Sequence, residues 1–112
     1  MPWAVTLHPE MAEEVESFSR EVRIALASSL RLLEAIGPTL GRPTVDTLKG
    51  SKIANLKELR FAADGGVWRV AFAFDGSRVA VLLAAGDKAG VSEARFYKTL
   101  IATAERRWRT WE

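Results

Sequence analysis

Three strand-length segments joined by two short turns dominate the second half of the sequence. They run over about residues 56–62, 67–74 and 78–85, and Asp-Gly pairs occupy the turns at 64–65 and 75–76. An Asp-Gly pair is typical of tight hairpin turns, because glycine adopts the required backbone conformation at little steric cost. The third segment is apolar on both faces, which favours a central position. The pattern predicts an antiparallel meander.

Apolar residues at helical spacing flank this meander on both sides. They recur every three or four positions over residues 11–36, which predicts one long helix or two helices joined near 17–20. Gly37-Pro38 is a helix stop signal. Ser92 is a predicted N-cap for a last helix, whose apolar stripe runs over 96–111.

A short alternation at the N-terminus completes the set of predicted elements. Trp3, Val5 and Leu7 alternate with small or polar residues, which predicts a first strand that ends before Pro9. The order is then strand, helices, meander and helix. It predicts a single α+β domain over residues 1–112, with helices packed on an antiparallel sheet.

The composition excludes several classes of protein. The chain has 112 residues and no cysteine, which excludes a disulfide scaffold, a thiolate metal site and a cysteine nucleophile. We find no carboxylate–histidine cluster typical of a metal site, and we expect no cofactor. No apolar run reaches the length of a membrane-spanning helix, and the signal-peptide pattern is absent. We therefore expect a cytoplasmic protein without a membrane partner.

Charge is unevenly distributed along the chain, although the formal net charge is only +2. Residues 10–21 carry five glutamates and one arginine, whereas residues 49–60 carry four cations and one glutamate. Three more arginines occupy positions 106, 107 and 109. Such segregation favours a basic face for a polyanion, and the alternative is ordinary solvated surface charge.

The first hairpin brings two arginines together. A turn centred on 64–65 pairs Ala62 with Val67, so Arg60 faces Arg69 two residues further along. Like charges directly opposite each other in a sheet are destabilising, so a chain that keeps them has a use for them. The planar guanidinium fork fits two oxygens of a phosphate, which makes phosphate the natural ligand.

The surroundings of Arg69 support two interpretations. Its face of the strand carries only small side chains, including Ala71 and Ala73, which favours an open, shallow site. Alternatively, Glu58 lies on the same side as Arg60 and neutralises both arginines in a surface network. A register slip of one residue would remove the pairing altogether.

Two further features carry weaker signals. The loop 86–90 places Asp87-Lys88 between two glycines after a strand, a common functional position, although it also suits a simple turn with an internal ion pair. His8 is the only histidine, and its place at a strand–helix junction favours a structural role. A mechanism that uses a pair of histidines is therefore excluded.

Several short motifs follow one another along nearly the whole chain. They are Gly-Pro-Thr-Leu-Gly-Arg-Pro at 37–43, Leu-Lys-Gly-Ser-Lys at 48–52, Asn-Leu-Lys-Glu-Leu-Arg at 55–60, Trp-Arg-Val-Ala-Phe-Ala-Phe at 68–74, and Leu-Leu-Ala-Ala-Gly-Asp-Lys-Ala-Gly at 82–90, followed by Phe96-Tyr97. In this order and spacing they resemble the RelE/HigB toxin superfamily, specifically its phage-derived HigB-like branch.

The resemblance implies a RelE-like α+β fold and a toxin of a type II toxin–antitoxin system. Members typically cut messenger RNA on the ribosome without a metal ion. A HigA-like helix-turn-helix antitoxin neutralises them, and they reach operator DNA only through that antitoxin. The ParE branch shares the fold but acts on DNA gyrase, so the fold does not settle the activity. A non-catalytic binding module that works only in the antitoxin complex is a further alternative.

The resemblance also implies site residues, namely the strand arginines and nearby lysines. The expected catalytic residues are Arg69, Arg60, Lys57 and Lys88. The expected RNA-binding residues are Lys49, Lys52, Tyr97 and Lys98. The arginines would clamp the scissile phosphate, and Lys57 or Lys88 would act as acid or base if neighbouring cations lower its pKa. The chain departs from many relatives in having Asp87-Lys88 in place of two lysines, and it lacks their late histidine.

Overall fold

The computed structural model describes residues 3–111, and its strands form one five-stranded sheet in the order β1-β5-β4-β3-β2. The strand bounds are β1 (Ala4–Leu7), β2 (Val45–Thr47), β3 (Lys57–Ala63), β4 (Gly66–Phe74) and β5 (Val79–Asp87). Strands β3, β4 and β5 form the predicted antiparallel meander. Strand β1 pairs with β5 in parallel, and the short β2 pairs with β3 in the antiparallel sense.

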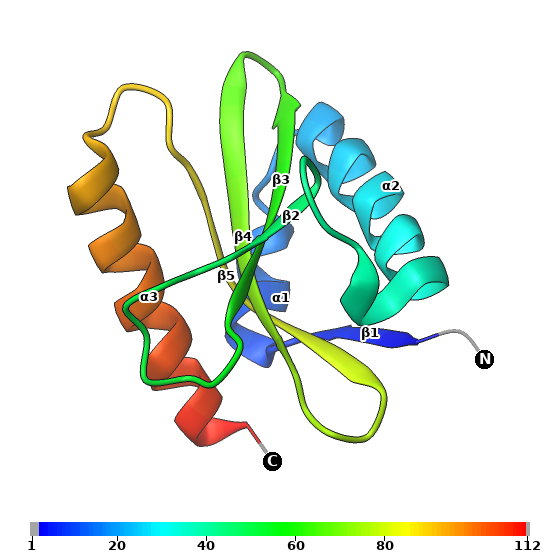
Figure 1. The fold of residues 1–112 in the computed structure, drawn as a ribbon. Helices are drawn as coiled ribbons and strands as arrows, with labels where there is room; N and C mark the ends of the chain where they lie inside the picture. The colour runs from blue at the N-terminus through cyan, green and yellow to red at the C-terminus, as the bar shows by residue number, and fades with distance from the viewer. Residues whose placement is uncertain (1–2, 112) are drawn as a thin grey trace.

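Helices cover both faces of this sheet (Figure 1). Helices α1 (Pro9–Val15) and α2 (Arg20–Ile36) are separate, because Ser19 caps the second by accepting a hydrogen bond from the Val22 amide. A 3₁₀ turn at Gly37–Thr39 follows α2. Helix α3 (Glu93–Thr110) begins after Ser92, the predicted N-cap. None of the helices within residues 3–111 has the length and apolarity that crossing a bilayer requires.

Two hydrophobic cores result, one on each face of the sheet. The core between the sheet and α3 includes Ala71, Ala73, Leu83, Phe96, Leu100 and Ala104. The core on the other face includes Met11, Leu26, Leu33, Leu59, Phe72 and Leu82. The α+β architecture expected from the sequence is therefore confirmed, with α1 and α2 on one face of the sheet and α3 on the other.

The prediction of an open face around Arg69 is wrong for most of its length. Ala71 and Ala73 are fully buried, at 0% and 1% exposure. Their small side chains allow α3 to lie close to the sheet, and they share one core with Phe96, Leu100 and Ala104 of that helix. Small residues on a strand therefore mark a closely packed helix here, not a vacant surface.

A buried arginine ties both ends of the chain to the sheet. Arg107 of α3 is 4% exposed, donates to the Leu83 carbonyl at 2.8 Å and forms a two-pronged ion pair with Glu14 of α1. Leu83 is the extra residue of a β-bulge, since Ala71 pairs with Ala84 and Phe72 pairs with Leu82. The hydrogen bonds that Arg107 donates to Glu14 raise the pKa of Arg107 more than its burial lowers it.

The neighbouring arginine provides a matched stability test. Arg107→Ala leaves the half-exposed Glu14 and the Leu83 carbonyl without their donor, so we expect a loss of about 3 kcal/mol in the free energy of unfolding. Arg106→Ala removes an exposed pair with Glu10 and should cost little. Urea unfolding of both variants measures the difference, and equal losses would contradict a buried role for Arg107.

Candidate active site at the arginine pair

The register of the hairpin places Arg60 of β3 directly opposite Arg69 of β4. This pairing is the one that the turn at 64–65 predicts, with Ala62 opposite Val67. Both guanidiniums lie on the α3 side of the sheet, because side chains alternate along a strand and Ala71 of the same face packs against α3. The structure therefore brings the two expected arginines together.

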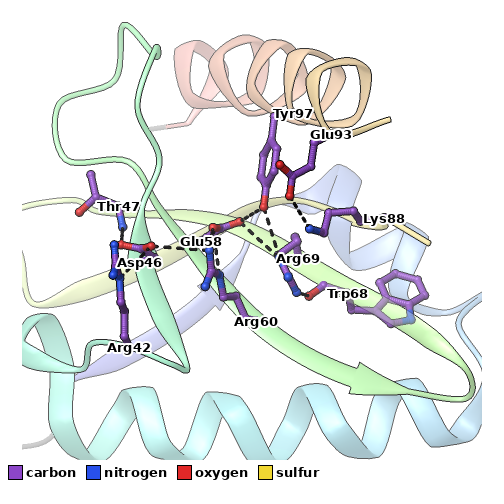
Figure 2. A network of polar contacts seen from close by, with 10 residues as sticks. All are labelled: Arg42, Asp46, Thr47, Glu58, Arg60, Trp68, Arg69, Lys88, Glu93 and Tyr97. Carbon is purple, nitrogen blue, oxygen red and sulfur yellow. Dashed lines mark hydrogen bonds and ion pairs between the residues drawn. The ribbon is translucent and has the colours of Figure 1, made fainter. Parts of the chain in front are cut away.

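Glu58 supplies the negative charge between them (Figure 2). Its side chain is only 4% exposed, and Oε2 accepts hydrogen bonds from Arg60 Nε at 3.1 Å and Nη2 at 2.9 Å. Oε1 lies 3.7 Å from Arg69 Nε. Burial would lower the pKa of Arg60, but the hydrogen bonds and charge of Glu58 raise it overall. The neutralising carboxylate is thus a buried centre of the cluster, not part of a surface network.

Tyr97 connects this cluster to α3. Its hydroxyl donates to Glu58 Oε1 at 2.7 Å and accepts from Arg69 Nε at 3.3 Å. Burial and then the hydrogen bond to Glu58 raise the pKa of Tyr97 above its ordinary value. The phenol therefore keeps its proton at neutral pH and acts as a fixed donor.

The two arginines differ in accessibility. The Arg69 side chain is 13% exposed, and its Nη1 donates to the Trp68 carbonyl at 2.9 Å. The Arg60 side chain is 33% exposed and faces Asp46 as well, with 3.6 Å between Nη2 and the carboxylate. Arg60 is therefore the more accessible of the two arginines to a ligand, whereas Arg69 is more buried and contacts Glu58 and Tyr97 within the cluster.

A pocket of about 470 Å³ opens beside Arg60, between β2, β3 and α3. It is lined by Arg42, Asp46, Thr47, Leu48, Lys49, Glu58, Arg60, Glu93, Tyr97 and Ile101. Both cations and carboxylates line its wall, and Asp46 also pairs with Arg42 at 3.2 Å. Leu48 and Ile101 add apolar surface, so the wall combines groups suited to a phosphate and to a nucleotide base.

Lys88 lies at the edge of the same cluster and pairs with Glu93 of α3 at 2.8 Å (Figure 2). The hydrogen bond and charge of Lys88 lower the pKa of Glu93. Asp87 accepts hydrogen bonds from the amides of Val67 and Ala89. Asp87 therefore stabilises the turn. Lys88 lies beside a carboxylate, whereas the expected acid or base role required neighbouring cations that would lower the pKa of the lysine.

Not all expected site residues reach the pocket. Lys57 lies on the opposite face of the sheet, with Leu59 and Phe61, because residues one apart on a strand point to opposite sides. Expecting it beside the arginines is therefore wrong. Lys49 lines the pocket, whereas the loop at Lys52 is bound to α3 through its amide and Glu105. Lys98 is exposed on α3 and is not among the lining residues.

His8 has the structural role that the sequence favoured. It is 4% exposed, accepts from the Glu10 amide through Nδ1, and contacts Thr110 Oγ1 through Nε2 at 2.8 Å. It therefore caps α1 and ties it to the end of α3. Within residues 3–111 no group of three or more histidine, cysteine, aspartate or glutamate side chains could hold a metal ion.

Asp46 and Glu93 are pocket residues that the sequence interpretation did not identify. Both are separated from the arginines in sequence, and each comes close only through the packing of β2 or α3. Glu58 was identified only as a neutralising alternative. The two-residue spacing from Arg60 predicts that Glu58 lies on the same face of the sheet, but nothing in the sequence indicates that Glu58 is buried.

Comparison with known proteins places this chain in a family. The family described as phage-derived protein Gp49-like matches residues 13–109. The chain is 42% identical to "Putative toxin HigB3" of Mycobacterium tuberculosis over 108 residues, which are 96% of this chain and 92% of that protein. It is 44% identical to "Putative toxin HigB2" of the same organism over 77 residues, 68% of this chain and 38% of that protein.

No solved structure matches the chain at a comparable level of significance. The family match nevertheless covers most of the sequence, and it includes both arginines, Glu58 and Tyr97. The resemblance to the phage-derived branch of HigB-type toxins is thereby confirmed, and the chain belongs to the phage-derived Gp49-like family.

Proposed function

We propose that this chain is the toxin of a HigB-like toxin–antitoxin system and that it cleaves messenger RNA without a metal ion. Its similarity to HigB3 and HigB2 supports the toxin assignment. The observation that carries the nuclease assignment is the Arg60–Arg69 pair, which buried Glu58 holds in place. The pair lies beside a pocket that is lined by charged and apolar side chains. The partner is an antitoxin, of the helix-turn-helix class, that carries the toxin to operator DNA.

RNA contains its own nucleophile, the 2′-hydroxyl, which attacks the adjacent phosphorus and forms a 2′,3′-cyclic phosphate. The 5′-oxygen is expelled and takes a proton from water. The protein must hold the phosphate, stabilise the charge that develops on it and assist proton transfer. Arg60 serves the first two tasks, because Glu58 fixes its guanidinium in advance of the reaction. Arg69 acts as a positioning residue through Glu58 and Tyr97.

The most exposed carboxylate of the pocket is the candidate for proton transfer. Of the three carboxylates that line it, Asp46 and Glu58 are 24% and 4% exposed, whereas Glu93 is 71% exposed. Like any exposed glutamate, Glu93 is ionised at neutral pH, and Lys88 lowers its pKa further, so it can accept the 2′-hydroxyl proton but only as a weak base. Lys49, also on the wall, binds the flanking phosphate.

Such a site is a weak catalyst for free RNA, because an ionised carboxylate of lowered pKa is a poor base. The only histidine of the chain is committed to the α1 cap. Ribosome-bound messenger RNA compensates by presenting the 2′-hydroxyl and phosphate in a fixed geometry, which is worth several orders of magnitude in rate. The ribosome in the cytoplasm is therefore the proposed place of action.

The cleavage proposal is tested by mapping messenger-RNA ends after induction of the toxin without its antitoxin. Wild type should produce new 5′ ends within coding regions, and Arg60→Ala should reduce them by about 100-fold, the size of a lost charge-stabilising contact. Arg31→Ala is the matched control, since Arg31 lies on α2 across the sheet and bonds only to Ser28 among the described residues.

Growth arrest with intact messenger RNA would contradict the nuclease assignment. An assay of DNA supercoiling by gyrase would then test the ParE-like alternative. Toxicity that persists after replacement of Arg60, Arg69 and Lys88 together would instead favour a non-catalytic binding module. Both results would leave the family membership unchanged.

The single tyrosine of the chain makes its protonation state directly measurable. Ultraviolet titration of the tyrosinate should give a midpoint above the ordinary value of 10.0, because burial and Glu58 favour the neutral phenol. The folded state then holds this proton more tightly than the unfolded chain, so its contribution to stability is lost as pH rises through that range. A midpoint at or below 10.0 would contradict a buried phenol that donates to Glu58.

A further inference from the structure

One half of β5 lacks a neighbour on its outer side. Strand β5 spans Val79–Asp87, but β1 pairs only with Val79 to Leu82. The chain turns into α1 after His8, whose amide donates to the Leu82 carbonyl. Among the described strands, none continues along residues 83–87 on that side. The sheet therefore has an open edge of about half a strand.

The backbone groups that face this edge follow from the pairing with β4. The Lys88 amide donates to the Val67 carbonyl of β4, so Gly86 also directs its backbone groups towards β4. Ala85 and Asp87 alternate with them and direct theirs towards the open side. The Leu83 carbonyl is occupied by Arg107. Ala85 and Asp87 thus present the backbone groups at which an added strand would bind.

A groove of about 480 Å³ runs over this edge, with Ala84, Ala85 and Gly86 on its floor. Its remaining lining residues are Glu14, Val91, Arg95, Phe96, Thr99, Leu100, Thr103, Arg106 and Arg107. Thr99 and Thr103 line this groove, whereas Tyr97 and Ile101 line the pocket of Arg60. At helical spacing these two pairs lie on different flanks of α3, so the groove is distinct from the candidate active site.

The charged residues that line the groove are Glu14 and three arginines. Glu14 pairs with Arg107, and Arg106 pairs with Glu10 at 3.1 Å, so these four charges compensate one another. Arg95 is exposed, and no carboxylate within residues 3–111 pairs with its guanidinium. Val91 adds an apolar side chain that is 41% exposed. An extended segment that carries carboxylates and one apolar side chain complements this lining.

We propose that the open edge of β5 binds an acidic, extended segment of the antitoxin as an added strand in line with β1. The identity of the partner rests on the proposed function. Strand addition satisfies the edge groups of Ala85 and Asp87 through main-chain hydrogen bonds, and pockets for alternate side chains supply specificity. Natural sheets rarely leave such an edge uncovered, because it invites non-specific pairing.

This mode of binding has a consequence for the active site. The segment would contact Gly86, which pairs with Arg69 in the ladder, and Phe96, which precedes Tyr97. It would not cover Arg60 or Lys49, which line the pocket on the other flank of α3. Binding at the edge is therefore compatible with an accessible Arg60, and the two surfaces can be tested separately.

Hydrogen exchange on the complex with the antitoxin of the same operon tests the proposal residue by residue. In the free toxin the Ala85 and Asp87 amides should exchange rapidly, whereas the Gly86 amide, which faces β4, is already protected. In the complex the Ala85 and Asp87 amides should slow by at least about tenfold. A stable complex in which both exchange as fast as in the free toxin would overturn the proposal.

Two variants address the backbone and the charge independently. Ala85→Pro removes the outward amide without breaking a bond to β4, and it should abolish binding of the antitoxin segment. Arg95→Glu, a surface change that leaves the backbone intact, should weaken binding by about tenfold or more through lost charge pairing. Arg109→Glu is its matched control on an exposed part of α3 outside the groove, and it should bind as wild type does.

Failure of the strand-addition proposal and failure of the proposed function give different experimental results. Arg60→Ala should bind the antitoxin as tightly as wild type while losing RNA cleavage. If the wild-type chain does not bind the antitoxin at all, the toxin–antitoxin assignment is overturned together with this proposal. Protection of Ala85 in the free toxin, with a dimer in sedimentation, would show a second copy at the edge and would also overturn it.

Discussion

The Glu58 carboxylate is buried among Arg60, Arg69 and Tyr97, and the arrangement of the candidate active site depends on it. Two guanidiniums directly opposite each other on adjacent strands repel, and a buried carboxylate without partners is costly. Here the carboxylate neutralises the two guanidiniums, and the Tyr97 hydroxyl donates a further hydrogen bond to it. The site therefore keeps a partly exposed cation at Arg60 in a fixed orientation, which is what stabilisation of a phosphate requires.

The same contacts determine how α3 is held. Tyr97 attaches the first half of the helix to the sheet through Glu58, and Arg107 attaches the second half through Leu83 and Glu14. Between them the helix packs on the small residues Ala71 and Ala73. One hollow lies on each flank of α3, so a single helix borders both the proposed RNA pocket and the proposed antitoxin groove.

Local signals predicted what depends on neighbours in sequence. The Asp-Gly turn at 64–65 fixed the register that places Arg60 opposite Arg69, and Ser92 marked the start of α3. Strand periodicity alone would also have excluded Lys57 from the face of Arg60, since the two residues are three positions apart on one strand and an odd offset places side chains on opposite faces. Only the resemblance to relatives implied a place for Lys57 beside the arginines.

Features that arise from packing between distant segments were not predictable. No sequence signal indicated that α3 would cover Ala71 and Ala73, because small residues suit both an open site and a closely packed helix. The parallel pairing of β1 with β5 and the placement of Asp46 and Glu93 have the same origin. Each joins segments that lie apart in sequence and adjoin only in the folded chain.

A double-mutant cycle between Glu58 and Arg69 tests most directly whether Glu58 holds the arginine pair together. Glu58→Gln should lower the free energy of unfolding by about 3 kcal/mol or more, because it leaves Arg60 and Arg69 facing each other without a counter-charge. In an Arg69→Met background the same change should cost less, by at least about 1 kcal/mol of coupling. Equal losses in the two backgrounds would show that Glu58 does not stabilise the pair, and would contradict this account of the site.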